Sequence, residues 1–246
     1  MSEPRAPAGA SSTIILPPEA LEELPLFPLP SGVLLPRTAM SLHIFEPRYR
    51  RMIADVMEGH RVLAIAMVDD EREPDRFGRP ALHPVGGVGI VRRSARLPDG
   101  RYNIVVEGVL RADVSVELPP ELPYRRARAR RLLDEAPSDP RGLDAPVAAL
   151  RSLCARVVAE LSEADADLMQ KLNEVSDPGA LADLVAAAAV QDPLDRQRIL
   201  AAIAVEQRVD LAAAALGALL LQAHADDDDD DEEGTGYGWG IAPGKA

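Results

Sequence analysis

The spacing of apolar residues changes near Pro137, from a period of two to a period of about 3.6. Before this point, short apolar or alternating runs end at Pro or Gly, as strands do; they occupy residues 33–35, 40–44, 62–68, 88–91, 102–106 and 114–118. After it, apolar residues recur three and four positions apart, as they do on one face of a helix. The sequence therefore predicts an α+β protein with a β-rich half followed by a helical half.

One helix is expected among the strands. Glu46 and Pro47 suit a helix start and Gly59 suits its end, and the apolar residues between them fall on one face: Tyr49, Met52, Ile53 and Val56. This face should close one side of a curled sheet or barrel.

Glycines mark two features of the expected sheet. Gly100, in the sequence Pro-Asp-Gly, can take the positive φ of a tight reversal and predicts a hairpin. Gly86, Gly87 and Gly89 could suggest a phosphate-binding loop, but no helix signal follows them. They predict a β-bulge or a sharp bend.

Four or five helices joined by short loops, and hence a bundle, are expected after Pro137. Asp177 and Asp192 each precede a proline, which predicts two helix N-caps. Ser162 with Asp165 resembles a capping box, and the last helix is expected over about residues 205–220.

The net charge of −13 is concentrated near the C-terminal end. Residues 224–246 hold eight acids and one base, a charge of −7, which leaves −6 for the rest. A mildly acidic body argues against nucleic acid as the main partner, because phosphate backbones attract basic surfaces. Adjacent carboxylates repel one another, so residues 224–246 are expected to form a disordered acidic and Gly-rich tail. Residues 1–23, which begin with Pro, Ala, Gly and Ser, are expected to be mobile.

The sequence shows no pattern typical of a catalytic or cofactor site. It contains no P-loop motif, and Lys171, one of only two lysines, is expected to be solvated rather than the buried base of a Ser/Lys hydrolase. His43 lies in an apolar run and is expected to be a hydrogen-bonded structural histidine. We therefore predict that the chain is not an enzyme and uses no cofactor.

Metal, disulfide, leader and membrane signals are also missing from the sequence. Cys154 is the single cysteine and lies on an apolar helical stripe, so it is expected to be a core residue. The acidic run mimics the start of a calcium loop, but the twelfth position is Gly240 instead of Glu. We predict no metal site. No secretory leader or membrane span is recognised, and a cytoplasmic location is expected.

Several segments, in this order, carry a resemblance to a known family: LPLFPLPSGVLLP (24–36), LHIFEPRYRRM (42–52), VGGVG (85–89), DGRYNIVVEGVLR (99–111), DPGALADLVA (177–186), RQRIL (196–200) and EQR (206–208). Over about residues 24–223 the chain resembles the N-terminal, substrate-binding domain of the Lon protease family in its stand-alone form. One departure is that the family often has Arg-Phe after the glycine at position 108, whereas Gly108 is followed here by Val-Leu-Arg. The missing aromatic weakens the case for a pocket there.

The resemblance implies a PUA-like β pseudobarrel of about six strands with one helix at residues 24–133, and a helical bundle at residues 139–223. In that family, this region recognises unfolded or tagged proteins, and an ATPase and a protease follow it. This chain is expected to lack both. The resemblance thus implies a non-catalytic protein- or peptide-binding module with a role in protein quality control. The alternative is a scaffold or regulatory partner of one folded protein, with the acidic tail modulating the contact.

Phe45, Arg48 and Tyr49 admit two interpretations. An aromatic and cationic mixture is common at interfaces, so these residues could line a peptide-binding rim. Alternatively, Phe45 belongs to the core, Glu46 caps the helix and Arg48 pairs with a neighbouring acid.

Overall fold

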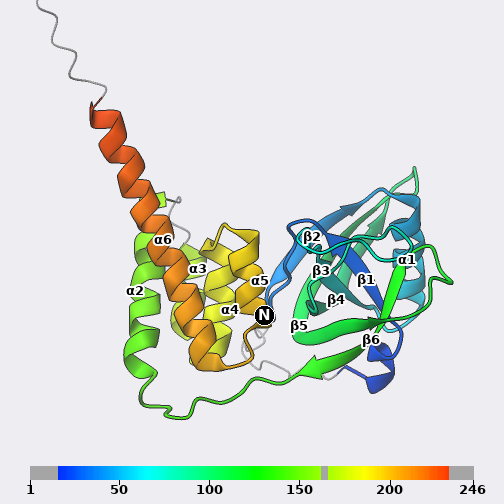
Figure 1. The fold of residues 1–246 in the computed structure, drawn as a ribbon, viewed down its shortest axis with the longest axis horizontal. Coiled ribbons are helices and arrows are strands. Elements are labelled where there is room, and N and C mark those ends of the chain that lie inside the picture. Colours follow the sequence, from blue (N-terminus) through cyan, green and yellow to red (C-terminus); the bar gives the residue numbers. More distant parts are fainter. Residues whose placement is uncertain (1–15, 162–165, 233–246) are drawn as a thin grey trace, which may run out of the picture. The chain divides into compact units, whose positions relative to one another are not determined.

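The computed structural model describes residues 16–161 and 166–232, and the chain divides into two compact units, residues 1–132 and 133–246 (Figure 1). We call these the barrel unit and the helical unit. The barrel unit contains the 3-10 helix η1 (Pro18–Leu21), the helix α1 (Pro47–Glu58) and six strands: β1 (Leu24–Leu29), β2 (Ala39–Ile44), β3 (Val62–Met67), β4 (Val85–Arg96), β5 (Tyr102–Glu117) and β6 (Arg125–Leu132). The helix η1 precedes the start of ordered structure that was expected at Leu24.

The six strands form one sheet in the order β2-β5-β4-β3-β1-β6, and β6 pairs again with β5. Five strands therefore close into a barrel, while β2 lies at the end of the sheet. All strand pairs are antiparallel except β1 with β3. The α+β class and the six strands are confirmed.

The helix α1 covers one side of the barrel, as predicted. Its buried residues are Tyr49, Met52, Ile53 and Val56, and Gly59 is its C-cap. These side chains join an apolar cluster that includes Phe27, Ile65 and Val106 from the sheet. A second cluster lies between β1, β3, β4, β5 and β6, with Leu24, Val88 and Val114 among its members.

The expected strand at residues 33–35 was wrong. These residues are buried but form a loop. A Cβ atom at Gly87 would lie 1.8 Å from the Leu34 carbonyl oxygen, and one at Gly108 would lie 2.1 Å from the Leu35 carbonyl oxygen. Glycine at both positions lets this loop rest directly on the sheet, so its apolar character reflects burial and not strand pairing.

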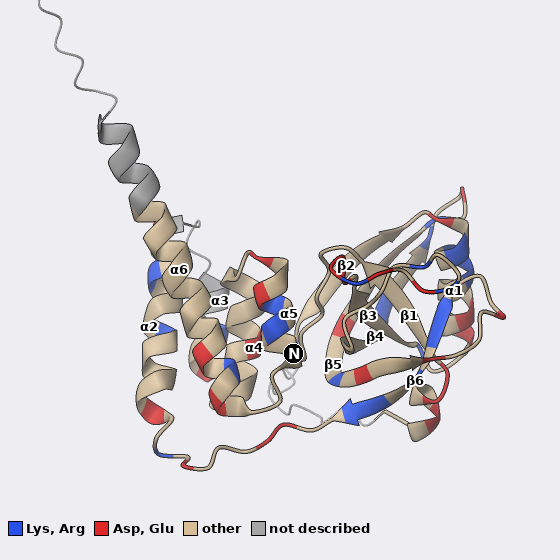
Figure 2. Cartoon of the chain, in the orientation of Figure 1, with Lys and Arg blue, Asp and Glu red and all other residues tan. Residues whose placement is uncertain are grey.

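The remaining strand predictions need three further corrections. Residues 102–106 and 114–118 were predicted as separate strands, but most of both belongs to β5, a single strand with irregular register. β1 was missed because it contains prolines. β6 was missed because five of its eight residues are arginines (Figure 2). Acids from neighbouring segments pair with most of these arginines: Glu117 with Arg125, Glu23 with Arg126, Glu22 with Arg128 and Asp113 with Arg130.

Both glycine predictions are confirmed. Gly100 has a φ of +81°, and its N–H donates to the Leu97 carbonyl oxygen in the hairpin between β4 and β5. The β4–β5 register shifts between Val88 and Gly89, where the bulge was expected.

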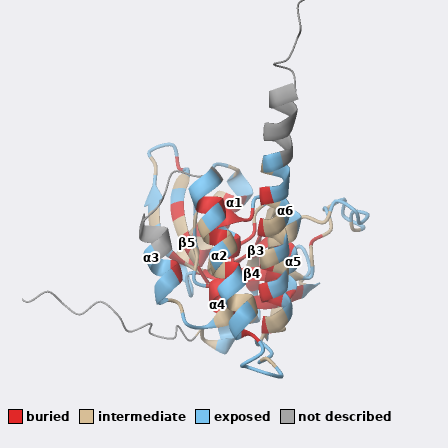
Figure 3. Cartoon of the chain, turned by 90° about the vertical axis from the view of Figure 1, so that its left-hand side faces the viewer, coloured by how far each residue is buried: buried red, intermediate tan, exposed pale blue. Residues whose placement is uncertain are grey.

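The helical unit contains α2 (Asp144–Leu161), α3 (Ala166–Glu174), α4 (Pro178–Ala189), α5 (Pro193–Ala201) and α6 (Val205–Glu232). Both aspartate N-caps are confirmed: the Asp177 carboxylate accepts from the Ala180 N–H at 2.7 Å, and that of Asp192 accepts from the Leu194 N–H at 2.6 Å. Eight of the twelve residues of α4 are buried (Figure 3), and Cys154 on α2 is fully buried, as expected.

The last helix is longer than expected. The helix α6 continues to Glu232, beyond the end expected near residue 220 and into the segment at residues 224–246 that was expected to be disordered. Three predicted features lie at least partly outside the described residues: the capping box of Ser162 and Asp165, the first 15 residues of the N-terminal segment, and residues 233–246 of the acidic and Gly-rich tail.

Candidate functional site

The barrel unit carries a groove of about 640 Å³. Its walls come from the C-terminal ends of β1 and β2, the start of α1, the loop at residues 78–80 and the segment at residues 120–125. The lining is mostly apolar or aromatic and includes Phe27, Leu29, Leu42, Phe45, Leu122 and Tyr124. An apolar lining with few polar groups is typical of a ligand-binding site.

Phe45 lies between β2 and α1 and lines this groove. Phe45 is 61% exposed, and its ring stacks on that of His43 with the centroids 6.4 Å apart. The expectation that Phe45 belongs to the core was therefore wrong. An exposed aromatic ring beside an apolar groove can provide contact area to a ligand.

Tyr49 also lines the groove and is only 7% exposed. Its ring packs edge-on against Phe27 with centroids 4.4 Å apart, and the Arg48 guanidinium carbon lies 4.5 Å from the Tyr49 ring centroid. Burial raises the pKa of Tyr49 above its ordinary value, so its hydroxyl remains protonated at neutral pH. The phenol therefore presents a neutral polar group in an apolar surrounding.

Arg48 forms an ion pair with Glu46 at 2.8 Å. The prediction that Arg48 pairs with a neighbouring acid is confirmed. Glu46 occupies the N-cap position of α1, but its side chain makes no capping hydrogen bond. The predicted cap was wrong because the Glu46 carboxylate accepts from Arg48 and not from the helix backbone.

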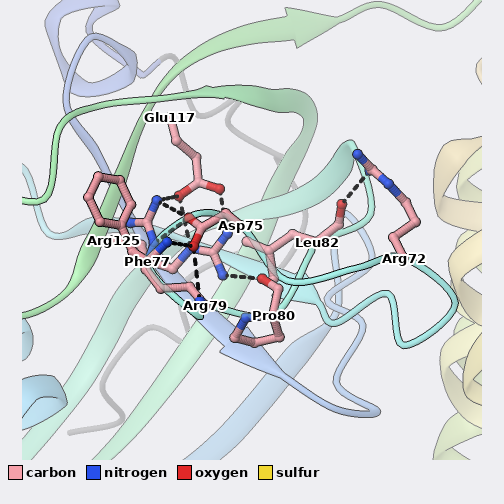
Figure 4. Close-up of polar contacts among 8 residues, drawn as sticks. All are labelled: Arg72, Asp75, Phe77, Arg79, Pro80, Leu82, Glu117 and Arg125. Atoms are coloured by element: carbon pink, nitrogen blue, oxygen red, sulfur yellow. Dashed lines mark hydrogen bonds and ion pairs between the residues drawn. The ribbon is translucent and has the colours of Figure 1, made fainter.

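A network of ion pairs holds the part of the groove wall that includes Arg79, Pro80 and Arg125 (Figure 4). The Asp75 carboxylate accepts from the backbone N–H groups of Phe77 and Arg79, at 2.8 and 3.0 Å, and pairs with the Arg79 guanidinium. Glu117 pairs with both Arg79 and Arg125, and Arg125 donates to the Pro80 carbonyl oxygen at 2.7 Å. The network thus ties the loop at residues 75–80 to β5 and β6.

This network also determines the charge of the groove. The hydrogen bond from Arg79 is the main cause that lowers the pKa of Asp75 to about 2, so the carboxylate is charged at neutral pH. Arg79 and Arg125 each form an ion pair with a carboxylate of their own chain, as Arg48 does. The charges of these three arginines are therefore balanced within the barrel unit.

His43, at the edge of the groove, has partners on both ring nitrogens. Its Nδ1 lies 2.6 Å from the Asn103 Oδ1, and Arg101 donates to its Nε2 at 3.2 Å. The expected hydrogen-bonded histidine is confirmed.

Within the segments that the structure describes, no group of three or more His, Cys, Asp or Glu residues could hold a metal ion. Over the same segments, none of the helices has the length and apolar character needed to cross a membrane.

A protein-family comparison matches residues 23–216 to the ATP-dependent protease La (LON) substrate-binding domain. The chain belongs to this family. It is 32% identical over 217 residues to Lon protease 2 of Sorangium cellulosum, which covers 86% of this chain and 26% of that protein. It is 27% identical over 206 residues to the Lon protease of Anaeromyxobacter dehalogenans, and the alignment covers 84% of this chain and 24% of that protein. The chain thus spans about a quarter of the length of these Lon relatives.

Solved structures of Lon N-terminal domains share the fold. The N-terminal domain of the Mycobacterium avium complex Lon protease aligns with a TM-score of 0.64 at 17% identity, over 79% of this chain and 98% of that one. The Lon N-terminal domain protein from Xanthomonas campestris aligns with a TM-score of 0.55 at 18% identity, over 78% of this chain and 97% of that one.

All three residues singled out from the sequence, Phe45, Arg48 and Tyr49, line the groove. Sequence reasoning missed the other lining residues, which include Pro80, Leu122, Tyr124 and Arg125. These residues come from loops and the start of β6, where no apolar period marks them, and only the closure of the barrel brings them to the same groove as the start of α1.

Proposed function

We propose that this LON substrate-binding domain is a non-catalytic module that binds exposed apolar segments of unfolded polypeptides, in the service of protein quality control. The groove beside Phe45 is the proposed site. The observation that carries the proposal is an exposed phenylalanine beside an apolar groove of about 640 Å³, in a family described by substrate binding.

The groove's chemistry supports an unfolded ligand over a folded one. A folded protein keeps most of its large apolar side chains inside, whereas an unfolded chain exposes them. The charged groups Arg48, Arg79 and Arg125 pair with carboxylates of their own unit, so a charged ligand would have to displace these pairs. An apolar side chain of an extended segment can bind without displacing these ion pairs.

Binding can be tested by fluorescence anisotropy with labelled, reduced and carbamidomethylated α-lactalbumin, which cannot refold. The wild-type protein should bind this probe and not the native form of α-lactalbumin. Phe45→Ala should weaken binding at least tenfold, which corresponds to about 1.4 kcal/mol, because an exposed aromatic anchor is lost.

Val116→Ala is the matched control. Val116 is a 58% exposed apolar residue on β5 that does not line the groove, so this variant should bind as the wild type does. Equal affinity of Phe45→Ala and wild type, or equal binding of the native and unfolded probes, would overturn the proposal.

A further inference from the structure

The strand β2 has one free edge in the part of the chain that the structure describes. It pairs with β5 in the register Met40 opposite Val106 and Leu42 opposite Ile104. At the end of the sheet, it has no second neighbouring strand among the described residues. In an antiparallel pair, the backbone groups of successive residues point alternately toward and away from the partner strand.

Two hydrogen bonds determine which groups of β2 point away. The Gly108 N–H donates to the Thr38 carbonyl oxygen at 2.8 Å, so the even-numbered residues of β5 face β2. The Leu97 N–H donates to the Arg101 carbonyl oxygen at 2.8 Å, so the odd-numbered residues of β5 face β4, in agreement with the first bond. Hence the even-numbered residues of β2 bond to β5, and the odd-numbered ones, Ala39, Ser41 and His43, direct their N–H and C=O groups outward.

These outward groups pair with no strand and no loop within residues 16–161 and 166–232: no backbone hydrogen bond links them to another segment there. Free edges in soluble proteins are commonly protected by proline, by charged side chains or by a bulge. The sequence of β2, AMSLHI, contains no proline and no Lys, Arg, Asp or Glu. The edge is therefore open to pairing with another extended chain.

The free edge borders the groove. Leu42 and His43 are among the groove's lining residues, and Met40 and Leu42 pack partly buried against the apolar cluster beneath α1. A strand added beside β2 places every second side chain on the same face as Met40 and Leu42. Those side chains would enter the groove next to Phe45.

We infer that an extended, uncharged stretch of polypeptide binds by adding a strand to the free edge of β2, with alternate apolar side chains in the groove. This inference rests on the proposed function and specifies how the ligand is held. The backbone pairs supply affinity that is independent of the ligand's sequence, and the groove selects apolar residues at every second position.

The direct test uses a labelled peptide, acetyl-Thr-Val-Thr-Phe-Thr-Val-Thr-amide, and two N-methylated forms. One form is methylated at the phenylalanine and both valines of the peptide, and the other at the two threonines that flank the phenylalanine. Each set blocks the N–H groups on one edge of the extended peptide. We expect one set to weaken binding at least tenfold and the other to change it less than twofold.

The identity of the sensitive set gives the direction of pairing. An antiparallel strand presents the threonine N–H groups to β2, and a parallel strand presents those of the apolar residues. Equal effects of the two sets, or no effect of either, would overturn the inference, because strand addition uses one edge only.

A variant of the protein provides the second test. Ser41→Pro removes an outward N–H and blocks the edge, yet it leaves the β2–β5 hydrogen bonds in place, since proline is tolerated at such positions of edge strands. Ser41→Val keeps the N–H and is the matched control. Ser41→Pro should lose at least tenfold in affinity for the peptide, and Ser41→Val should lose less than twofold.

Circular dichroism and thermal melting test whether Ser41→Pro is folded. If this variant is not folded, the N-methylated peptides test strand addition on the wild-type protein.

The two proposals can fail separately. If neither unfolded α-lactalbumin nor the peptide binds, the proposed function is wrong. If both bind while the two N-methylated peptides behave alike, only the pairing with β2 is wrong.

Discussion

Replacing Arg208 by Met should destabilise the helical unit strongly. Arg208 on α6 has no exposed surface. Its Nη1 and Nη2 donate to the two Asp134 carboxylate oxygens at 2.9 and 2.6 Å, and its Nε donates to the Ala202 carbonyl oxygen at 3.0 Å. Asp183, which is 3% exposed, lies 3.5 Å from Nη1. Burial acts to lower the pKa of Arg208, but the hydrogen bond to Asp134 and the charge of Asp183 outweigh it, so the pKa is raised.

The size of the effect follows from these contacts. Removing one partner of a buried ion pair costs about 3–5 kcal/mol, because the other charge stays buried without its counterion. Asp134 is 42% exposed and can be rehydrated, whereas Asp183 cannot. We therefore expect the lower end of this range, about 3 kcal/mol. With a urea m-value of about 2 kcal/mol/M, the midpoint of unfolding should fall by about 1.5 M.

Urea unfolding of the full chain, followed by circular dichroism at 222 nm, measures this midpoint, since the helical unit contributes most of the helix. Arg198→Met is the matched control: Arg198 pairs with Asp195 at 2.8 Å but is 67% exposed, so its loss should cost less than about 0.5 kcal/mol. Equal midpoints for the two variants would refute the reasoning, because it attributes the difference to burial.

Three further predictions concern single contacts. Asp177→Ala should lower the free energy of unfolding by about 1 kcal/mol in the same urea assay, while Asp177→Asn keeps the acceptor and most of the stability; equal losses would contradict a capping role. Cys154 is fully buried, which raises the pKa of its thiol, so Ellman's reagent should label it in urea and not in the folded protein; rapid labelling without urea would contradict this. Burial and the hydrogen bond to Asp55 raise the pKa of Tyr124 to about 12, so its contribution to stability is complete below pH 10 and falls as the pH rises toward 12. Absorbance titration of wild type and Tyr124→Phe at 295 nm should show one tyrosine fewer ionising near pH 12 in the variant, and a difference centred at pH 10 would contradict the assignment.

Features that depend on a few consecutive residues were predicted well. Asp177 and Asp192 each precede a proline, and a side-chain acceptor and a fixed φ at a helix start act locally, so both N-caps were predicted correctly. The same holds for the helix at Pro47–Glu58 and for the turn at Gly100, whose positive φ is a property of that residue.

Predictions failed where a distant part of the chain determines the structure. The arginines of β6 hide the period-two pattern of a strand. Their acidic partners come from other segments and lie beside them only in the folded chain: Glu22, Glu23, Asp113 and Glu117. For Phe45, an apolar residue between a strand and a helix suggests burial as readily as exposure. Its exposure depends on which segments lie opposite it in the closed barrel.

The sequence by itself determined the change from strands to helices, the two aspartate N-caps, the turn at Gly100 and the family, because each depends on residue types at short spacings or on their order along the chain. Only the tertiary structure decided that β5 and β6 close the barrel and that β2 has, among the described residues, a free edge beside the groove. Pairing between strands joins residues far apart in sequence, such as Asp113 and Arg130 or His43 and Asn103. No local pattern specifies such a pairing, so the open edge and the groove are properties of the folded barrel.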